Sequence, residues 1–321
     1  MNRQDWKSFA RRNPYLFSLI LLVIIIFVNL FFQHNIFERE TLNSNMRIFL
    51  PLIILAAGQA IVILGGGIDI SVGSIVSIVN VILATQVGLK GDPQKMYLIM
   101  AFSLLVGMLA GALNGFFVAF MRLQPIITTY ATSFLYAGLA LFILPNPGGG
   151  IPQSFSNFYR DTTPLGLPLA FLIIAVILLA WGFIQQTRYG RYLFAVGGKA
   201  DAAYETAVPV SVVQFSTYVI AGLMAAISGI AITMLVASGN AGTGDQLTLS
   251  SVTAVVIGGT ALSGGIGGVA GSIIGAIILG LIKNIISFAN IDTWWQTLVN
   301  AAIIVVALAA PGVINLIRRR R

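Results

Sequence analysis

The chain is a series of apolar runs, most of them about as long as a membrane crossing, separated by polar segments. A transmembrane helix needs about 20 apolar residues, and fewer where the segment is broken or buried in protein. The pattern predicts ten spans, at residues 15–32, 48–64, 70–88, 96–121, 125–144, 165–185, 212–237, 250–262, 266–289 and 294–317. The third and eighth adjoin glycine clusters, and we expect half-helices or re-entrant segments there.

The predicted fold class is therefore an all-α integral membrane protein. One transmembrane domain covers residues 15–317, between an N-terminal segment at 1–14 and a basic tail at 318–321. Composition agrees, because 57% of the residues are hydrophobic and 9% are charged, whereas soluble domains carry about 25% charge. The absence of cysteine excludes disulfides and thiolate metal sites, and the single histidine, His34, excludes histidine clusters.

The positions of the basic residues predict the orientation of the chain. They flank the spans instead of forming one face, which argues against nucleic acid as a partner for this chain of net charge +8. With the N-terminus inside, twelve basic residues lie inside: Arg3, Lys7, Arg11, Arg12, Arg122, Arg188, Arg191, Lys199 and Arg318 to Arg321. Five lie outside: Arg39, Arg47, Lys90, Lys95 and Arg160. Cytoplasmic loops are enriched in Lys and Arg, so both termini are predicted to be cytoplasmic. The acids Glu38, Glu40, Asp92, Asp161, Asp245 and Asp292 are expected outside.

An acid and three adjacent glycines interrupt the apolar pattern at residues 65–74, which read Gly-Gly-Gly-Ile-Asp-Ile-Ser-Val-Gly-Ser. A carboxylate within a membrane domain is costly and usually faces a cavity, a polar partner or another chain. Asp69 has two interpretations. It could line a transport route, or its side chain could accept backbone N–H bonds at the start of the next helix.

Hydroxyl and amide side chains within the spans are the candidates for a route that carries a small polar solute. They are Gln59, Asp69, Ser71, Ser74, Ser77, Asn80, Asn114, Thr128, Thr129, Thr132 and Ser133. The alternative for each is a hydrogen bond that joins two helices within the protein.

A weak internal repeat is also visible. The apolar run that ends at Gly66 and Gly67 recurs as Val-Val-Ile-Gly-Gly at residues 255–259, before the ninth span. Paired broken helices in two halves of a transporter mark a binding site near the membrane midplane. Chance similarity between apolar, glycine-rich stretches is the competing interpretation.

The long inner segment at residues 187–210 is the candidate contact with a cytoplasmic partner. Gly197 and Gly198 predict a turn, and residues 200–206 predict a short helix with exposed acids. Such a helix can dock in a groove of another protein. An ordinary surface loop is the alternative.

Taken together, these segments resemble the ribose-type permeases of bacterial ABC importers. The resemblance is carried by residues 66–74, 197–208, 240–244, 255–265 and 271–280, and it extends in order over nearly the whole chain. It implies a vitamin-B12-importer-like (type II) helical arrangement and a second permease subunit, identical or homologous. It also implies a cytoplasmic ABC ATPase and a periplasmic solute-binding protein. The implied coupling residues are Gly197, Gly198, Lys199, Asp201, Ala202, Ala203 and Glu205.

The resemblance implies a permease of the bacterial inner membrane that imports a sugar or sugar-like solute. The chain has no Gly-x-x-x-x-Gly-Lys-Ser/Thr phosphate loop, so we expect no cofactor on this chain and no ATP hydrolysis by it. ATP and Mg²⁺ would bind the partner ATPase. The alternative function is an ion-coupled secondary transporter or facilitator, which would need intramembrane charges, and only Asp69 and Lys283 qualify.

Overall fold

The structure is a computed structural model that describes residues 15–89, 91–289, 292, 295, 298, 301, 302 and 305. Helices are the regular structure of the described part, which otherwise contains loops and a single bridge between Gly148 and Gly239. The first helices are α2 (Leu16–Phe32), α3 (Arg39–Leu64), α4 (Val72–Gln86), α5 (Pro93–Gly115), a π-helical turn (Phe116–Phe120) and α6 (Pro125–Ile143). The later ones are α7 (Gln153–Asp161), a 3₁₀ turn (Pro164–Gly166), α8 (Leu169–Gln186), α9 (Arg188–Gly198), α10 (Ala200–Glu205), α11 (Val210–Val236), α12 (Asp245–Ile257) and α13 (Val269–Phe288).

The helices follow the predicted spans, but fewer of them are long. Among the described residues, six helical segments are long and apolar enough to cross a membrane: α3, α5 with its π-helical turn, α6, α8, α11 and α13. Three further apolar helices, α2, α4 and α12, are shorter than this limit. The segments at 1–14 and 318–321 and most of the span at 294–317 lie outside the described residues. Short helices at the third and eighth spans match the half-helices expected there.

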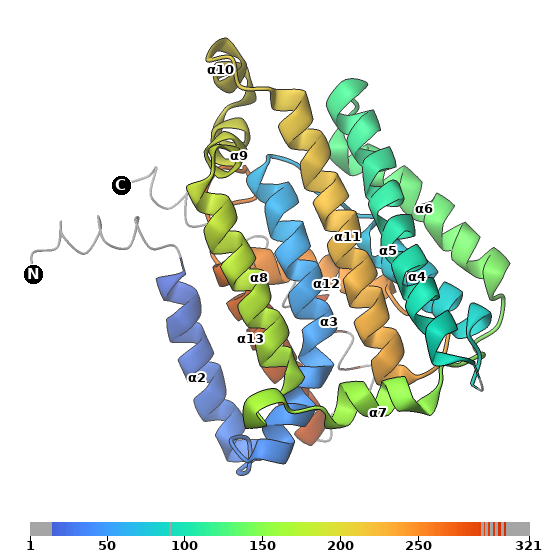
Figure 1. The fold of residues 1–321 in the computed structure, drawn as a ribbon. Helices are drawn as coiled ribbons and strands as arrows, with labels where there is room; N and C mark the ends of the chain where they lie inside the picture. The colour runs from blue at the N-terminus through green and yellow to red at the C-terminus, as the bar shows by residue number, and fades with distance from the viewer. Residues whose placement is uncertain are drawn as a thin grey trace, which may run out of the picture.

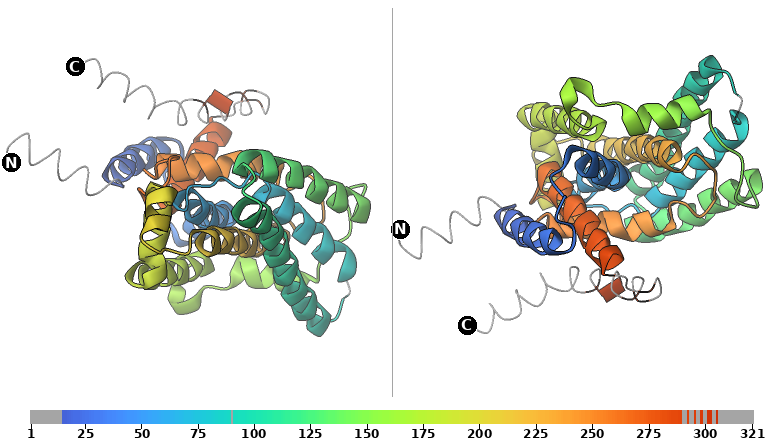
Figure 2. Two further views of the ribbon diagram at one scale, coloured as in Figure 1. Left: turned by 90° about the horizontal axis from the view of Figure 1, so that it is seen from above. Right: turned by 90° about the horizontal axis from the view of Figure 1, so that it is seen from below.

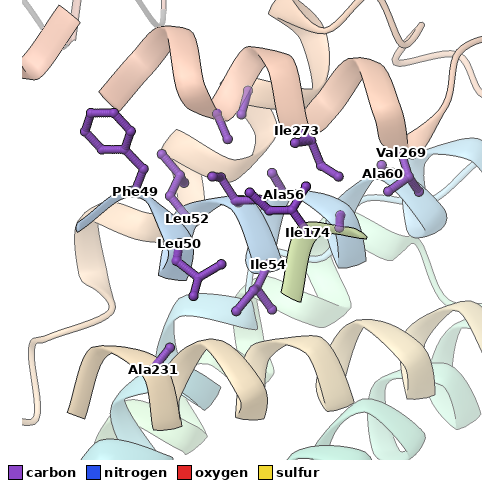
Figure 3. Packing of buried hydrophobic residues seen from close by; sticks show 14 of the residues in the cluster. Phe49, Leu50, Leu52, Ile54, Ala56, Ala60, Ile174, Ala231, Val269 and Ile273 are labelled. Atoms are coloured by element: carbon purple, nitrogen blue, oxygen red, sulfur yellow. The ribbon is translucent and has the colours of Figure 1, made fainter. Parts of the chain in front are cut away.

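Helix α3 is the centre of the bundle. Protein buries 89% of its most apolar stretch, compared with 17% for α8. Figure 3 shows why: α3 places Leu52, Ala56 and Ala60 toward Ile273 of α13, while α11 covers another side. Small residues allow such close approach between membrane helices. Helix α3 is therefore surrounded by protein, whereas α8 presents most of its surface outward.

Helices α5 and α11 also pack through small residues. Gly107 and Gly111, one turn apart on α5, lie directly against Gly222 of α11, where a Cβ on any of the three would overlap the facing backbone. This contact holds α11 beside α5, and α11 lies against α3 and α4 as well (Figure 1).

The two ends of the bundle differ. Helix α7 lies across one end, whereas α9 and α10 lie at the other, as the views in Figures 1 and 2 show. Helix α7 is amphipathic: it buries Phe155 and Tyr159 and exposes Phe158, Arg160 and Asp161. We refer to these ends as the α7 end and the α10 end.

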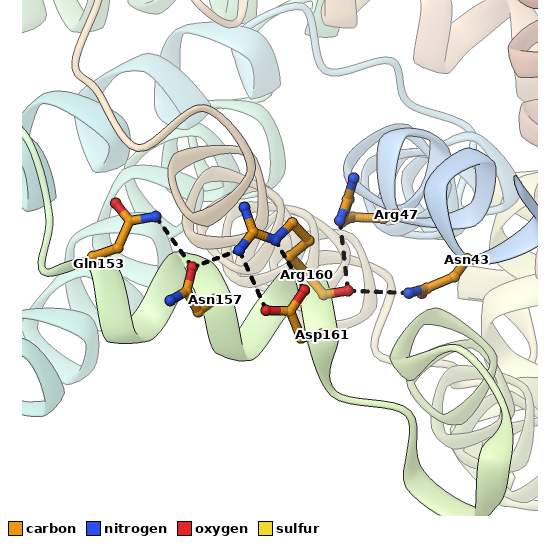
Figure 4. A network of polar contacts seen from close by, with 6 residues as sticks. All are labelled: Asn43, Arg47, Gln153, Asn157, Arg160 and Asp161. Carbon is orange, nitrogen blue, oxygen red and sulfur yellow. Dashed lines mark hydrogen bonds and ion pairs between the residues drawn. The ribbon is translucent and has the colours of Figure 1, made fainter. Parts of the chain in front are cut away.

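Polar contacts fix α7 to the start of α3 (Figure 4). The carbonyl oxygen of Arg160 accepts hydrogen bonds from Asn43 at 3.0 Å and from Arg47 at 3.5 Å. The hydroxyl of Tyr159 donates to the carbonyl oxygen of Arg47 at 2.8 Å. The Arg160 guanidinium also bonds Asp161 at 2.9 Å, and this hydrogen bond holds the pKa of Asp161 below its usual value. These contacts attach α7 to the first turns of α3.

Candidate functional site

Helix α3 ends in a Schellman motif at the α10 end. The N–H of Gly66 bonds the carbonyl of Ile63 at 2.9 Å, and the N–H of Gly67 bonds that of Val62 at 3.0 Å. Gly66 has φ +85°, a conformation that glycine adopts without steric cost. The chain then runs without helix through Asp69 until α4 begins at Val72. Residues 65–71 therefore form a break between two helices.

Asp69 is fully buried in this break and is hydrogen-bonded inside the protein. Its Oδ1 accepts from the backbone N–H of Ser71 at 2.8 Å and from the Ser71 hydroxyl at 2.7 Å. The Asn114 amide of α5 donates to the Ser71 hydroxyl at 2.7 Å and lies 3.4 Å from Asp69 Oδ2. Asn114 Oδ1 in turn accepts from Thr132 of α6 at 2.7 Å. These contacts join the break to α5 and α6.

Two further side chains hold the backbone of the break. The Gln59 amide of α3, with its nitrogen toward the Asp69 carbonyl and its oxygen toward the Asp69 N–H, lies 3.2 and 3.3 Å from these groups. The Thr129 hydroxyl accepts from the N–H of Ile70 at 3.0 Å. Tyr218 of α11 packs against Gly67, and its buried hydroxyl has no hydrogen-bond partner within the described residues.

The side chains predicted to line a route therefore divide into two groups. Most are buried and bonded within the protein: Gln59, Asp69, Ser71, Ser77, Asn80, Asn114, Thr128, Thr129 and Thr132. Ser74 and Ser133 are partly exposed. Ser74 is the one residue between Val72 and Ala84 that is not buried, and Ser133 bonds only its own helix, at the carbonyl of Tyr130.

Ser77 and Asn80 hold the segment that links α11 to α12. The Asn80 amide nitrogen donates to the carbonyl of Ser238 at 3.0 Å, and its oxygen accepts from the N–H of Asn240 at 2.8 Å. The Ser77 hydroxyl accepts from the N–H of Gly244 at 3.0 Å. Backbone groups without a helix need such partners inside a membrane. The segment therefore runs along α4 toward the α10 end.

Helix α12 begins deep in the bundle, beside the first turn of α4. Gly244 packs against Gly73, and the Thr248 hydroxyl accepts from the N–H of Gly73 at 3.1 Å. At 1.5 Å per residue, Gly73 lies about 20 Å from the Gln86 end of α4. Asp245, which the sequence analysis expected outside the membrane, directly follows Gly244 and so lies beside Gly73, because Ser77 and Asn80 hold the preceding segment along α4.

The second glycine cluster repeats the first in backbone geometry. The N–H of Gly259 bonds the carbonyl of Val256 at 2.9 Å, the N–H of Thr260 bonds that of Val255 at 3.1 Å, and Gly259 also has φ +85°. Helix α12 thus ends in the same motif as α3. The match pairs Gly66 with Gly259, one residue away from the pairing that the sequence indicated. Because this motif ends many helices, the internal repeat stays a prediction.

The end of α9 lies between the two breaks. The N–H of Gly265 donates to the carbonyl of Leu64 at 3.1 Å, which joins the second break to the last residue of α3. Gly197 of α9 fits against both: a Cβ there would overlap the Leu64 carbonyl and approach the Gly265 nitrogen at 2.7 Å. Gly264 lies against Gly66 and Gly197. We call Gly66, Gly197, Gly264 and Gly265 the glycine joint.

The segment at 187–210 has more helix than predicted. Gly197 and Gly198 are the last residues of α9 and not a turn, because the chain leaves the helix only at Lys199, with φ −160° and ψ 100°. Helix α10 exposes Asp201, Ala202, Tyr204 and Glu205, whereas Ala203 is buried. A Cβ on Gly198 would meet no atom within 4 Å.

A cavity of about 790 Å³ opens between α10 and the turn before α6. Asp201 and Glu205 lie on one wall, Arg122 and Gln124 lie on another, and Gly66 reaches it from the glycine joint. Tyr204 and Glu205, both exposed on α10, also belong to its lining, so the cavity borders the exposed side of α10.

Several residues of this arrangement were not predicted from the sequence. Thr248 caps α4, Gly264 and Gly265 complete the joint, and Asn240 turns the segment before α12, with its side chain accepting from the N–H of Gly242 at 2.9 Å. The glycines at 264 and 265 were visible as part of the family resemblance, but no local pattern indicates their contact with α9. No group of three or more potential metal ligands occurs among the described residues.

Comparisons with known proteins agree with this architecture. The family described as "Branched-chain amino acid transport system / permease component" matches residues 41–308. The ribose import permease protein RbsC of Haemophilus influenzae is 30% identical over 300 residues, which cover 91% of each chain. That of Bacillus subtilis is 30% identical over 304 residues, covering 92% of this chain and 90% of the relative. The fructose import permease protein FruG of Bifidobacterium longum is 35% identical over 270 residues, covering 79% and 77%.

No solved structure matches the chain. The matches nevertheless extend over most of its length and include both helix breaks and the segment between α8 and α11. We conclude that the chain belongs to the branched-chain amino acid transport system / permease component family, and within it to the ribose-type ABC importer permeases.

Proposed function

We propose that the chain is the membrane-spanning subunit of a binding-protein-dependent ABC importer that carries a sugar or sugar-like solute into the bacterial cytoplasm. The observation that carries this proposal is the similarity to ribose import permeases over 91% of the chain, together with the helical membrane architecture. The chain supplies the passage, and a partner ATPase binds ATP and Mg²⁺ and drives the transport.

We propose ten spans, with both termini in the cytoplasm. Nine predicted spans coincide with described helices, and the tenth falls at residues 294–317. The lysine and arginine excess on the side of 187–210 supports this orientation. The α10 end would then face the cytoplasm and the α7 end the periplasm. The predicted domain at 15–317, with flanking segments at 1–14 and 318–321, belongs to this proposal.

We propose that the ATPase docks on α10. Asp201, Ala202 and Glu205 are exposed there, and Lys199 and Gly198 precede them without a tertiary contact that would bury them. Buried Ala203 holds α10 to the protein, and Gly197 joins it to the helix breaks. A rigid movement of the docked ATPase would therefore reach residues 65–71 and 258–268 directly, and such movements drive alternating access.

We assign the residues of the first break mainly to transmission. Asp69, Ser71 and Asn114 join α4, α5 and α6 into one hydrogen-bonded unit, so that these helices would move together. Among the predicted route residues, Ser74 and Ser133 are the accessible ones. A second permease subunit would complete the passage, and a periplasmic binding protein would deliver solute at the α7 end.

Reconstitution of the chain with its ATPase and binding protein tests the proposal. Proteoliposomes that contain the complete complex should accumulate radiolabelled solute only when ATP is present on the side of the membrane that carries the ATPase. D-ribose and D-fructose are the first probes. Vanadate should stop the uptake. Uphill transport by this chain alone, driven by an ion gradient and insensitive to vanadate, would instead establish a secondary transporter.

A further inference from the structure

The segment before α12 carries polar side chains into the membrane region. Residues 238–244 follow α4 inward through the bonds of Ser77 and Asn80, and α12 starts about 20 Å from the Gln86 end of α4. The apolar core of a bilayer is about 30 Å thick. With the Gln86 end of α4 taken as the surface of this layer, the start of α12 lies about 20 Å below it.

Between residues 240 and 246, three polar residues are exposed: Asn240 before α12, and Asp245 and Gln246 at its start. Within the described part of the chain, neither the Asp245 carboxylate nor the Gln246 amide has a hydrogen bond or ion pair. The Asn240 side chain uses only its oxygen, for the N–H of Gly242, which leaves its NH₂ group free. We call these residues the 240–246 edge.

An exposed carboxylate at this depth cannot face lipid, because a charge in hydrocarbon is too costly. It must face water or polar groups. Asp69, the other acid in the membrane region, satisfies this requirement inside the protein, through Ser71 and Asn114. Asp245 has no such partners, so its surroundings must come from outside the described bundle.

We propose that the 240–246 edge lines the transport route and contacts a neutral, hydroxyl-rich solute through hydrogen bonds. This inference rests on the proposed function and places the contacts on residues other than those that the sequence pattern indicated. A carboxylate accepts bonds from hydroxyl groups, while carboxamides both donate and accept. Together they can replace part of the solute's hydration without a net charge on the solute.

The neighbours of the edge fit this role. Ser74, the one residue between Val72 and Ala84 that is not buried, follows Gly73, which packs against Gly244 directly before Asp245. Leu249, one turn after Asp245 on α12, is 52% exposed and continues the same face with an apolar side chain. Polar groups beside apolar surface are typical of sites that bind small molecules.

Cysteine accessibility tests the proposal without knowledge of the solute. The chain has no cysteine, so each introduced thiol is unique in it. Asp245→Cys and Gln246→Cys would be reacted with a charged, water-soluble methanethiosulfonate reagent in the complete importer. Leu179→Cys, on the outward surface of α8 with 74% exposure, is the matched lipid-facing control. Thiolates form readily only in water, so the variants at 245 and 246 should react about tenfold faster than the control, or more.

The reaction should also respond to the transport cycle. With solute-loaded binding protein or with vanadate-trapped nucleotide, the rate at 245 should change, while the rate at 179 stays constant. Equal inertness of all three thiols in every state would overturn the proposal, because the edge would then be covered by protein or lipid. Failure of the wild-type importer to transport with ATP would reject the proposed function instead, so the two failures are distinguishable.

Measurements of uptake provide a second test. They compare Asp245→Leu with the control Asp92→Asn, and both residues lie at the start of a helix. Uptake of D-ribose, or of whichever sugar the wild type carries, should fall about tenfold or more for Asp245→Leu, with unchanged binding of the ATPase. Asp92 caps α5 through the N–H of Gln94, a role that asparagine retains, so that variant should transport normally. Normal uptake by Asp245→Leu would contradict the solute contact.

Discussion

The backbone N–H of Gly265 donates a hydrogen bond to the carbonyl of Leu64 at 3.1 Å. This bond links the ends of the two helices that terminate in the same Schellman motif, α3 directly and α12 through its following loop. Carbonyls at the end of a helix lack partners within it, so Gly265 satisfies a group that would otherwise be unpaired in the membrane region. With Gly197 packed against the same carbonyl, one atom of α3 contacts both the second break and α9.

The glycine joint predicts that Gly197→Ala uncouples the importer. A Cβ at this position overlaps the Leu64 carbonyl, and the resulting overpacking costs about 1–3 kcal/mol and displaces α9. Uptake in proteoliposomes should fall by about tenfold, since 1.4 kcal/mol corresponds to a factor of ten. Basal ATP hydrolysis by the complex should persist.

Gly182→Ala is the matched control for this variant. Gly182 lies in α8, and a Cβ there would meet no atom within 4 Å, so the substitution should leave uptake unchanged. Gly264→Ala tests the same joint at a glycine with φ +84°. Its control is Gly88→Ala, because Gly88 has φ +74° but no neighbouring atom within 4 Å, so this variant introduces the backbone strain without the steric overlap. Wild-type coupling in Gly197→Ala would show that α9 does not transmit motion through Leu64.

Asp69 predicts a contrast between two substitutions. Asp69→Asn keeps an oxygen for the two bonds from Ser71, so uptake and thermal stability in detergent should change little. Asp69→Leu leaves the Ser71 N–H and hydroxyl without their acceptor, which costs about 1–3 kcal/mol for each buried group. We expect a clear drop in melting temperature for leucine. Loss of uptake in a stable Asp69→Asn protein would instead indicate that the charge itself takes part in gating.

We predict that replacement of Asn80 releases residues 238–244 from their position along α4. Asn80→Leu removes the part-buried bonds to Ser238 and Asn240, and the loss of each such bond costs about 0.5–1.5 kcal/mol. Melting temperature should fall, and amide hydrogen exchange at 238–244 should rise. Thr85→Val on the same helix removes only local bonds to the carbonyls of Val81 and Ile82, and it should change stability by less than about 1 kcal/mol. Equal effects of the two variants would argue against an anchoring role for Asn80.

We predict that charge reversal at Glu205 weakens binding of the partner ATPase. The side chain is exposed on α10 and forms no ion pair within the described residues, so its charge is available to a partner. The substitution Glu205→Arg replaces a negative charge by a positive one in the proposed contact between α10 and the ATPase, where it would no longer match the partner's charges. The ATPase recovered by pull-down should fall by about tenfold, with normal membrane insertion. Glu38→Arg, at the other end of α3, should retain the ATPase, and equal recovery for both would remove α10 from the contact.

The sequence by itself determined the helices and the family. Apolar runs of membrane length predict helices wherever they occur, because backbone groups in lipid must be paired within the segment. Nine of the predicted spans accordingly overlap a described helix, six of these helical segments are long and apolar enough to cross a membrane, and the glycine clusters mark the ends of α3 and α12. The order of motifs indicated the ribose-type permeases, which the comparisons confirmed.

Only the tertiary structure decided which polar side chains are internal and which reach the surface. Ser77 and Ser74 look alike in the sequence, yet Ser77 bonds Gly244 and is buried, while Ser74 is accessible. No sequence pattern indicates that the segment before Asp245 is held along α4 by Asn80, which accepts a hydrogen bond from the N–H of Asn240. Likewise, no pattern near Gly265 indicates that it meets Leu64. These outcomes depend on contacts between residues far apart in the chain. Hydropathy reflects only the free energy of transferring each side chain out of water, so it contains no information about such contacts.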